Sequence, residues 1–214
     1  MKNILFSILL AVVLSTSCTT GKPDNFDYGK IENGKYVNSF FGCEITIPES
    51  WSVQSNEQIN NLVEQGRELI AGDDKNMKAM YKASEINTAN LLMAFEYEVG
   101  ATVEFNTNIA IVAENLANTP GIKKGSDYLF HVKKLLSQTQ VDYSHIDEQC
   151  EREEIAGAVF YKMNTTLNFA GVDIYQTYYS TILNNFSFSI VISYSGDEQH
   201  QQLLQILKSL KFTN

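Results

Sequence analysis

The sequence predicts an α+β fold in which a twisted, mainly antiparallel sheet is flanked by helices. Several segments alternate apolar and polar residues, the two-residue period of a half-buried strand. Others repeat apolar residues every three or four positions, as amphipathic helices do. The last third of the chain consists of successive strand-like segments with short connections, which indicates an antiparallel meander. Because the helices and the sheet must cover each other's apolar faces, we expect a single domain.

The first half of the chain predicts an extended segment followed by two helices. Apolar residues alternate with polar ones over 41–47, and Pro48 ends this strand. Ser55 and Gln58 have the spacing of a capping box, which marks the start of a helix. A second, short helix is expected around residues 77–81.

The middle of the chain predicts one strand and two helices. Every second residue over 91–99 is apolar, so we expect a strand with these side chains on one face. Residues 109–116 carry apolar side chains at helical spacing, and Pro120 would stop that helix. A further helix is expected over 126–138.

The last third predicts four strands and a closing helix. The strands are expected over 143–150, 158–169, 172–183 and 186–194. Gly171 and the Asn184–Asn185 pair separate the last three at hairpin distance. Ser195 and Glu198 have capping-box spacing, and the helix after them would bury Leu203, Ile206, Leu207 and Leu210.

Both ends of the region 35–214 resemble PsbP-like domains of bacterial lipoproteins. The resemblance rests on the opening stretch 34–42 with Pro48 and Trp51 after it, and on a closing hairpin, strand and helix that finish at Phe212. Such domains are similar in fold to the photosystem II protein PsbP and to a eukaryotic Ran-binding import factor. The resemblance implies an α/β/α sandwich with a non-enzymatic accessory or binding role, and it transfers no catalytic residue.

The N-terminus has the pattern of a signal peptide, which we assign to residues 1–17. Lys2 precedes an apolar run over 4–14 that would span only about 16 Å as a helix, against a hydrocarbon core of roughly 30 Å. Cys18 follows small residues, which resembles the lipobox whose cysteine receives a diacylglyceryl group. Ser15 stands where leucine is usual, and Ser15 with Ser17 also fits ordinary signal peptidase, so plain secretion is the alternative.

The remaining chain is expected to be exported and attached by lipid on Cys18 to the outer face of a bacterial membrane. Residues 18–35 are polar and contain glycine and proline, which predicts a flexible tether. Residues 36–214 would then form the single PsbP-like domain.

Composition excludes some partners. The chain has a formal net charge of −9, which argues against nucleic acid and against electrostatic docking on anionic lipid. Cys43 and Cys150 could form a disulfide after export or remain as two small buried side chains. Neither has metal-ligand spacing, so we predict no metal and no cofactor.

One acidic cluster could bind a hard cation such as calcium, but it lacks the spacing of an EF-hand loop. We interpret it as a solvated strand edge that discourages edge pairing. No catalytic arrangement stands out, so we do not expect an enzyme. The cluster consists of Asp142, His145, Asp147, Glu148, Glu151, Glu153 and Glu154.

Tyrosines on adjacent strands of the meander are the candidate binding surface, namely Tyr161, Tyr175, Tyr178 and Tyr179. The alternative is a core with tyrosine hydroxyls at its rim. We therefore expect a surface-tethered lipoprotein that binds an unknown protein or small molecule. The alternatives are a cell-envelope hydrolase with a site assembled from distant residues, and a carrier of a small apolar ligand.

Overall fold

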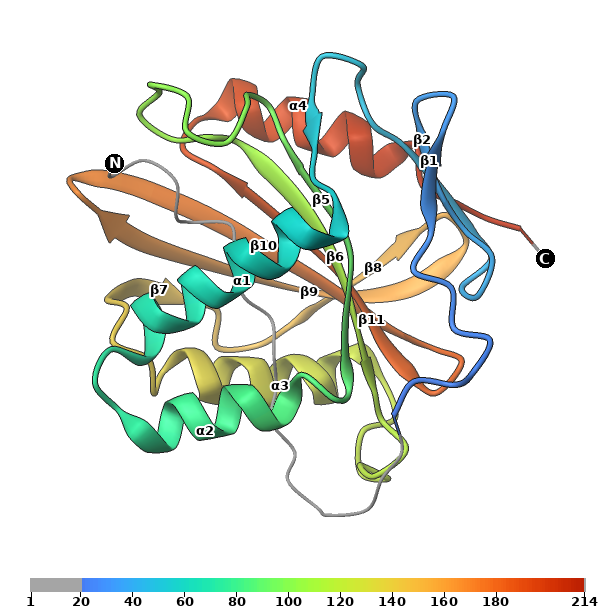
Figure 1. Cartoon of the computed structure of the whole chain (residues 1–214), viewed down its shortest axis with the longest axis horizontal. Coiled ribbons are helices and arrows are strands. Elements are labelled where there is room, and N and C mark those ends of the chain that lie inside the picture. Colours follow the sequence, from blue (N-terminus) through green and yellow to red (C-terminus); the bar gives the residue numbers. More distant parts are fainter. Residues whose placement is uncertain (1–20, 214) are drawn as a thin grey trace.

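The computed structural model of the chain describes residues 21–213, which form four helices and twelve strands (Figure 1). The helices are α1 (Asn56–Ala71), α2 (Lys75–Ser84), α3 (Gly125–Leu136) and α4 (Asp197–Lys208). The first six strands are β1 (Lys30–Glu32), β2 (Lys35–Asn38), β3 (Cys43–Thr46), β4 (Ser52–Val53), β5 (Thr88–Phe95) and β6 (Asn108–Asn115). The others are β7 (Tyr143–Ile146), β8 (Glu151–Ile155), β9 (Ala158–Phe169), β10 (Val172–Leu183), β11 (Phe186–Tyr194) and β12 (Lys211–Phe212).

The strands form two sheets, and the pairings within both are antiparallel. The large sheet has the order β4-β5-β6-β11-β10-β9-β7, with β8 also paired to β9. The small sheet has the order β1-β2-β3-β12. The expected meander is confirmed, and β9, β10 and β11 have the bounds that the sequence pattern predicts.

Both faces of the large sheet are covered. Helices α1, α2 and α3 lie on one face, while α4 and the small sheet lie on the other (Figure 1). Strand β11 illustrates this: Ile190 and Ile192 pack in the cluster with α4, whereas Val191 packs in the cluster with α3. The α+β class and the helix–sheet–helix layering are therefore confirmed.

The first three helices agree with the sequence pattern. Ser55 accepts a hydrogen bond from the backbone N–H of Gln58, whose side chain accepts one from the backbone N–H of Ser55, so the capping box exists. Helix α3 begins at Gly125, which is buried directly against the backbone of Ser180 in β10. Glycine allows this approach because it has no Cβ.

The predicted helix over 109–116 is wrong, because these residues form β6. This strand lies between β5 and β11 in the interior of the sheet. Its residues face covered layers on both sides, so Ile109 and Val112 are both buried. A strand buried on both faces loses its alternation, and its apolar residues then also fit helical spacing.

The strand expected over 91–99 is real, but its assignment to a single apolar face is wrong. The register between β5 and β6 shifts between Asn90 and Leu92, which marks a β-bulge. As a result Leu91 packs with Leu92 in the cluster on the α4 side, whereas Met93 packs on α1. The strand ends at Phe95, before the end of the apolar pattern.

The start of the last helix also differs from the prediction. The N-cap of α4 is Gly196, and Ser195 donates hydrogen bonds from its N–H and hydroxyl to the side chain of Gln199 rather than pairing with Glu198. The strand expected over 143–150 is shorter, because β7 ends at Ile146. A separate strand, β8, follows it and was not predicted.

Much of the expected tether is part of the domain. The ring of Phe26 lies 4.8 Å from that of Phe40 and 5.4 Å from that of Phe186, measured between centroids. The carbonyl of Tyr28 accepts a hydrogen bond from the Tyr36 hydroxyl, and β1 pairs with β2. Residues 26–35 therefore pack on the sheets instead of forming a flexible linker.

The signal-peptide and lipidation predictions concern residues 1–20, so Cys18 lies outside the described part of the chain. Within the described part, no helix is long and apolar enough to cross a membrane. Cys43 and Cys150 are both free thiols. They belong to apolar clusters on opposite faces of the large sheet and form no disulfide, and Cys43 is buried as the alternative predicts, whereas Cys150 is only half-buried.

Candidate functional site

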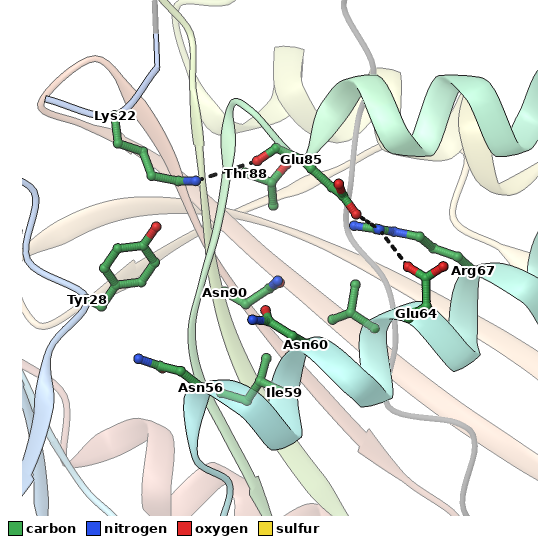
Figure 2. Close-up of a pocket in the computed structure, with 11 residues that line it drawn as sticks. Lys22, Tyr28, Asn56, Ile59, Asn60, Glu64, Arg67, Glu85, Thr88 and Asn90 are labelled. Atoms are coloured by element: carbon green, nitrogen blue, oxygen red, sulfur yellow. Dashed lines mark hydrogen bonds and ion pairs between the residues drawn. The ribbon is translucent and has the colours of Figure 1, made fainter.

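A hollow of about 570 Å³ lies between α1, the first half of β5 and the segment 22–28 (Figure 2). It is partly open to solvent. The residues that line it are Lys22, Tyr28, Asn56, Ile59, Asn60, Val63, Glu64, Arg67, Glu85, Thr88 and Asn90. Apart from Ile59 and Val63, these side chains carry groups that form hydrogen bonds or charges.

The floor of the hollow comes from β5 and one wall from α1. Thr88 and Asn90 precede the bulge in β5. Their side chains lie on the face of the sheet that α1 covers. Asn56 and Asn60 are one helical turn apart, so they lie on the same side of α1. Ile59 and its apolar neighbours on α1 pack on the far half of β5, which holds the wall in place.

One end of the hollow is closed by a charged triad. Arg67 pairs with Glu64 at 3.2 Å and also with Glu85. Only 13% of the Arg67 side chain is exposed. The same three residues line an adjoining hollow of about 300 Å³, whose other residues include Lys78 and Lys82. The triad therefore forms the shared boundary of two polar depressions, and its two carboxylates share one guanidinium.

Lys22, which contacts the backbone of Glu85, is a cation that has no carboxylate partner among residues 21–213. The Lys22 ammonium donates a long hydrogen bond of 3.5 Å to the backbone carbonyl of Glu85. It also lies 5.8 Å from the centre of the Tyr28 ring, and Tyr28 is 39% exposed. An ammonium with such weak contacts remains able to bind an anionic group.

Three amide side chains add unused hydrogen-bonding groups. Within the described residues, the side chains of Asn56, Asn60 and Asn90 form no hydrogen bond, and Asn60 and Asn90 lie near each other in Figure 2. An amide offers two N–H donors and one acceptor. The hollow can therefore bind a polar ligand through several groups without first breaking bonds within the protein.

No protein-family model and no curated protein matches the sequence. Among solved structures, the fold is similar to that of the cyanobacterial PsbP (CyanoP) from Synechocystis sp. PCC 6803. The two chains are 12% identical, the TM-score is 0.47, and the match covers 84% of this chain and 91% of that one. It is also similar to LpqN of Mycobacterium tuberculosis, described as involved in cell envelope biogenesis, at 10% identity and a TM-score of 0.44, over 80% and 83% of the two chains. The first of these structures is a PsbP, and PsbP-like domains are what the sequence resembles.

The four tyrosines proposed from the sequence do not form one surface. Tyr178 and Tyr179 are 1% and 2% exposed, so the prediction that they contact a ligand is wrong. They are buried because β10 is covered on both faces, with Tyr178 towards α3 and Tyr179 towards α4. Tyr161 is half-buried on the α3 side, 5.8 Å from the Lys124 ammonium. Tyr175 is 38% exposed.

Tyr175 belongs instead to a short stack of rings at the end of β11. Its ring lies 5.6 Å from that of Tyr194, which lies 4.2 Å from and nearly parallel to the His200 ring. Burial lowers the pKa of His200, which favours the neutral imidazole. Through Tyr175, this stack contains the most exposed of the four proposed tyrosines.

The acidic cluster is organised by ordinary strand-edge contacts. Asp147 lies 2.8 Å from the His145 ring nitrogen and accepts hydrogen bonds from Asn164, while Lys162 pairs with Glu151 at 3.0 Å. Partial burial raises the pKa of Asp147, but the hydrogen bonds from Asn164 and His145 lower it more, so the net shift is downward. Over residues 21–213, no three acidic, histidine or cysteine side chains gather as metal ligands would.

Proposed function

We propose that this protein is a lipoprotein of the bacterial cell envelope, anchored through Cys18, that binds a polar ligand in the hollow between α1 and β5. The anchor is inferred from the signal-like residues 1–17 and the lipobox-like Cys18. The observation that carries the binding role is a set of hydrogen-bonding groups around one hollow, Lys22 and three asparagines, without strong partners of their own.

The charges of the hollow favour binding over catalysis. A general acid or base needs a carboxylate that can exchange a proton with the substrate. Glu64 and Glu85 are both engaged in ion pairs with Arg67, so neither carboxylate is free of a protein partner. The same pairing leaves Lys22 and the amides as the groups available to a ligand.

The anchor can be tested by growing cells with a palmitate analogue and measuring label on the protein. Wild type and the matched control Cys150→Ala should be labelled, whereas Cys18→Ala should not. Undiminished label in Cys18→Ala would exclude lipidation at this residue. Release of the wild-type protein into the medium without label would support plain secretion instead.

The binding role can be tested by native mass spectrometry of protein purified from membranes. We expect a co-purified small molecule that is lost in the double variant Asn60→Ala with Asn90→Ala. Asn76→Ala is the matched control, because Asn76 is exposed on α2 and does not line the hollow. An adduct that survives the double variant would place the ligand elsewhere, as the alternative of an apolar carrier requires.

A further inference from the structure

We propose that the hollow between α1 and β5 faces the membrane and binds the phosphate of a phospholipid headgroup. This inference rests on the lipidation of Cys18 proposed above. It adds the orientation of the domain and the chemical class of the ligand.

The orientation follows from the length of chain between the anchor and the hollow. Only four residue steps separate Cys18 from Lys22, and an extended chain spans at most about 3.6 Å per residue. Lys22 therefore lies within about 14 Å of a lipidated Cys18. Because Lys22 forms part of the hollow, this end of the domain stays close to the headgroups.

The packing of the following residues prevents the link from becoming longer. Phe26 sits in a cluster of rings that includes Phe41, 6.0 Å away, and Phe186. Asp27 accepts hydrogen bonds of 2.7 Å from both the backbone N–H and the hydroxyl of Ser39. To extend the link beyond Lys22, the protein would have to unpack these contacts, so the anchor holds the hollow rather than a distant surface near the bilayer.

The groups around the hollow suit a phosphate. Phosphate oxygens only accept hydrogen bonds, and their strongest donors are cationic. Lys22 supplies an ammonium whose present bond is long, and Asn60 and Asn90 supply amide donors. Tyr28, exposed beside Lys22, is of the residue type enriched at membrane–water interfaces, where its ring lies at headgroup level.

The local charge permits an anion although the whole chain is acidic. The chain carries a net charge of −9. The lining of this hollow has two cations and two carboxylates and is therefore neutral, so it does not share the negative charge of the whole chain. The cations are Lys22 and Arg67, and the carboxylates are Glu64 and Glu85.

The orientation can be tested in the lipidated protein, reconstituted in vesicles of phosphatidylethanolamine and phosphatidylglycerol that contain a nitroxide headgroup label. A fluorophore is attached to Glu57→Cys, beside the hollow, or to Glu154→Cys, exposed on β8 at the other edge of the sheet, with Cys150 replaced by alanine. We expect several-fold stronger quenching at position 57. Inserting a Gly/Ser segment of roughly 20 residues before Gly21 should remove the difference. Equal or stronger quenching at position 154 would overturn the orientation.

The ligand class can be tested by NMR on the full mature protein in detergent, titrated with dihexanoylphosphatidylglycerol or with glycerol 3-phosphate. The lipid should shift the side-chain amide signals of Asn60 and Asn90. Binding should weaken at least about tenfold in Lys22→Gln, since a charge-assisted bond is lost, and should not change in Lys208→Gln on α4.

Two results of this titration would overturn the headgroup proposal. One is shifts caused by glycerol 3-phosphate but not by the lipid, which would assign the hollow to a soluble phosphate ester. The other is no shift with either probe. The titration does not depend on the anchor, so failure of Cys18 lipidation is recognised separately by palmitate labelling and leaves this measurement valid.

Discussion

Replacing Gly125 by alanine is expected to destabilise the protein by about 3 kcal/mol. A Cβ at this position would overlap the carbonyl oxygen of Ser180 and lie 2.6 Å from its carbonyl carbon. These backbone atoms belong to β10, which pairs with β9 and β11 on its two sides and cannot retreat without breaking those pairings. Overpacking of a core costs about 1–3 kcal/mol, and an immobile backbone neighbour places this substitution at the upper end.

The effect can be measured by urea unfolding, followed through the fluorescence of Trp51, the single tryptophan, which is buried. A loss of about 3 kcal/mol corresponds to a fall in Tm of roughly 6–12 °C for a domain of this size. Gly121→Ala is the matched control, because no atom lies within 4 Å of its added Cβ, and it should change stability by less than about 0.5 kcal/mol. If Gly125→Ala loses less than about 1 kcal/mol, the close packing of α3 on β10 is refuted.

Two further predictions concern the buried tyrosines and the hollow. Burial raises the pKa of Tyr81 to about 12 and also raises those of Tyr128 and Tyr178, so above pH 10 the folded protein keeps protons that the unfolded chain loses. The free energy of unfolding should therefore be steady to about pH 9 and then fall. The fall should reach at most about 1.4 kcal/mol per pH unit for each such tyrosine. Urea titrations at several pH values measure this, and a free energy of unfolding that did not change with pH would contradict the prediction. The double variant Asn60→Ala with Asn90→Ala should melt within about 2 °C of wild type, since neither amide has a hydrogen-bond partner in the described structure, and a larger loss would mean that these amides stabilise the fold.

The sequence predicts the fold best where one face of a strand differs from the other or where a turn has a clear signal. The hairpin between β10 and β11 has both signals. Apolar and polar residues alternate along much of β11, and Asn184 and Asn185 in the turn adopt φ angles of +49° and +65°, which asparagine tolerates. Strand β6 has neither. It is buried on both sides, and even Glu114 is covered, with its carboxylate accepting a 2.9 Å hydrogen bond from the Tyr128 hydroxyl of α3. A buried carboxylate in an apolar run gives no sign of its partner in the sequence.

The hollow was not predicted, because its residues become neighbours only through packing. The one local signal was the pair Asn56 and Asn60, one turn apart just after the capping box, and such polar pairs are common on helix surfaces. Asn90 joins them because α1 crosses β5, and Lys22 because the supposed tether packs on the domain. The prediction of a tyrosine binding surface was wrong for a different reason. The sequence shows that β10 carries aromatic residues, but it does not show that both faces of β10 are covered.

The bulge in β5 also bears on how the protein avoids self-association. On the side away from β6, β5 is paired with β4 at Ala94 and Phe95, and the Met93 carbonyl accepts a hydrogen bond from the Gln54 N–H. The stretch before Met93 is a free edge among the residues described. Free edges of this kind are templates on which other chains add strands and form aggregates. The extra residue at Leu91 breaks the regular spacing of the backbone N–H and C=O groups that an incoming strand would need. One inserted residue thus makes this edge unfavourable to a strand of a second copy, while the hollow beside it stays accessible.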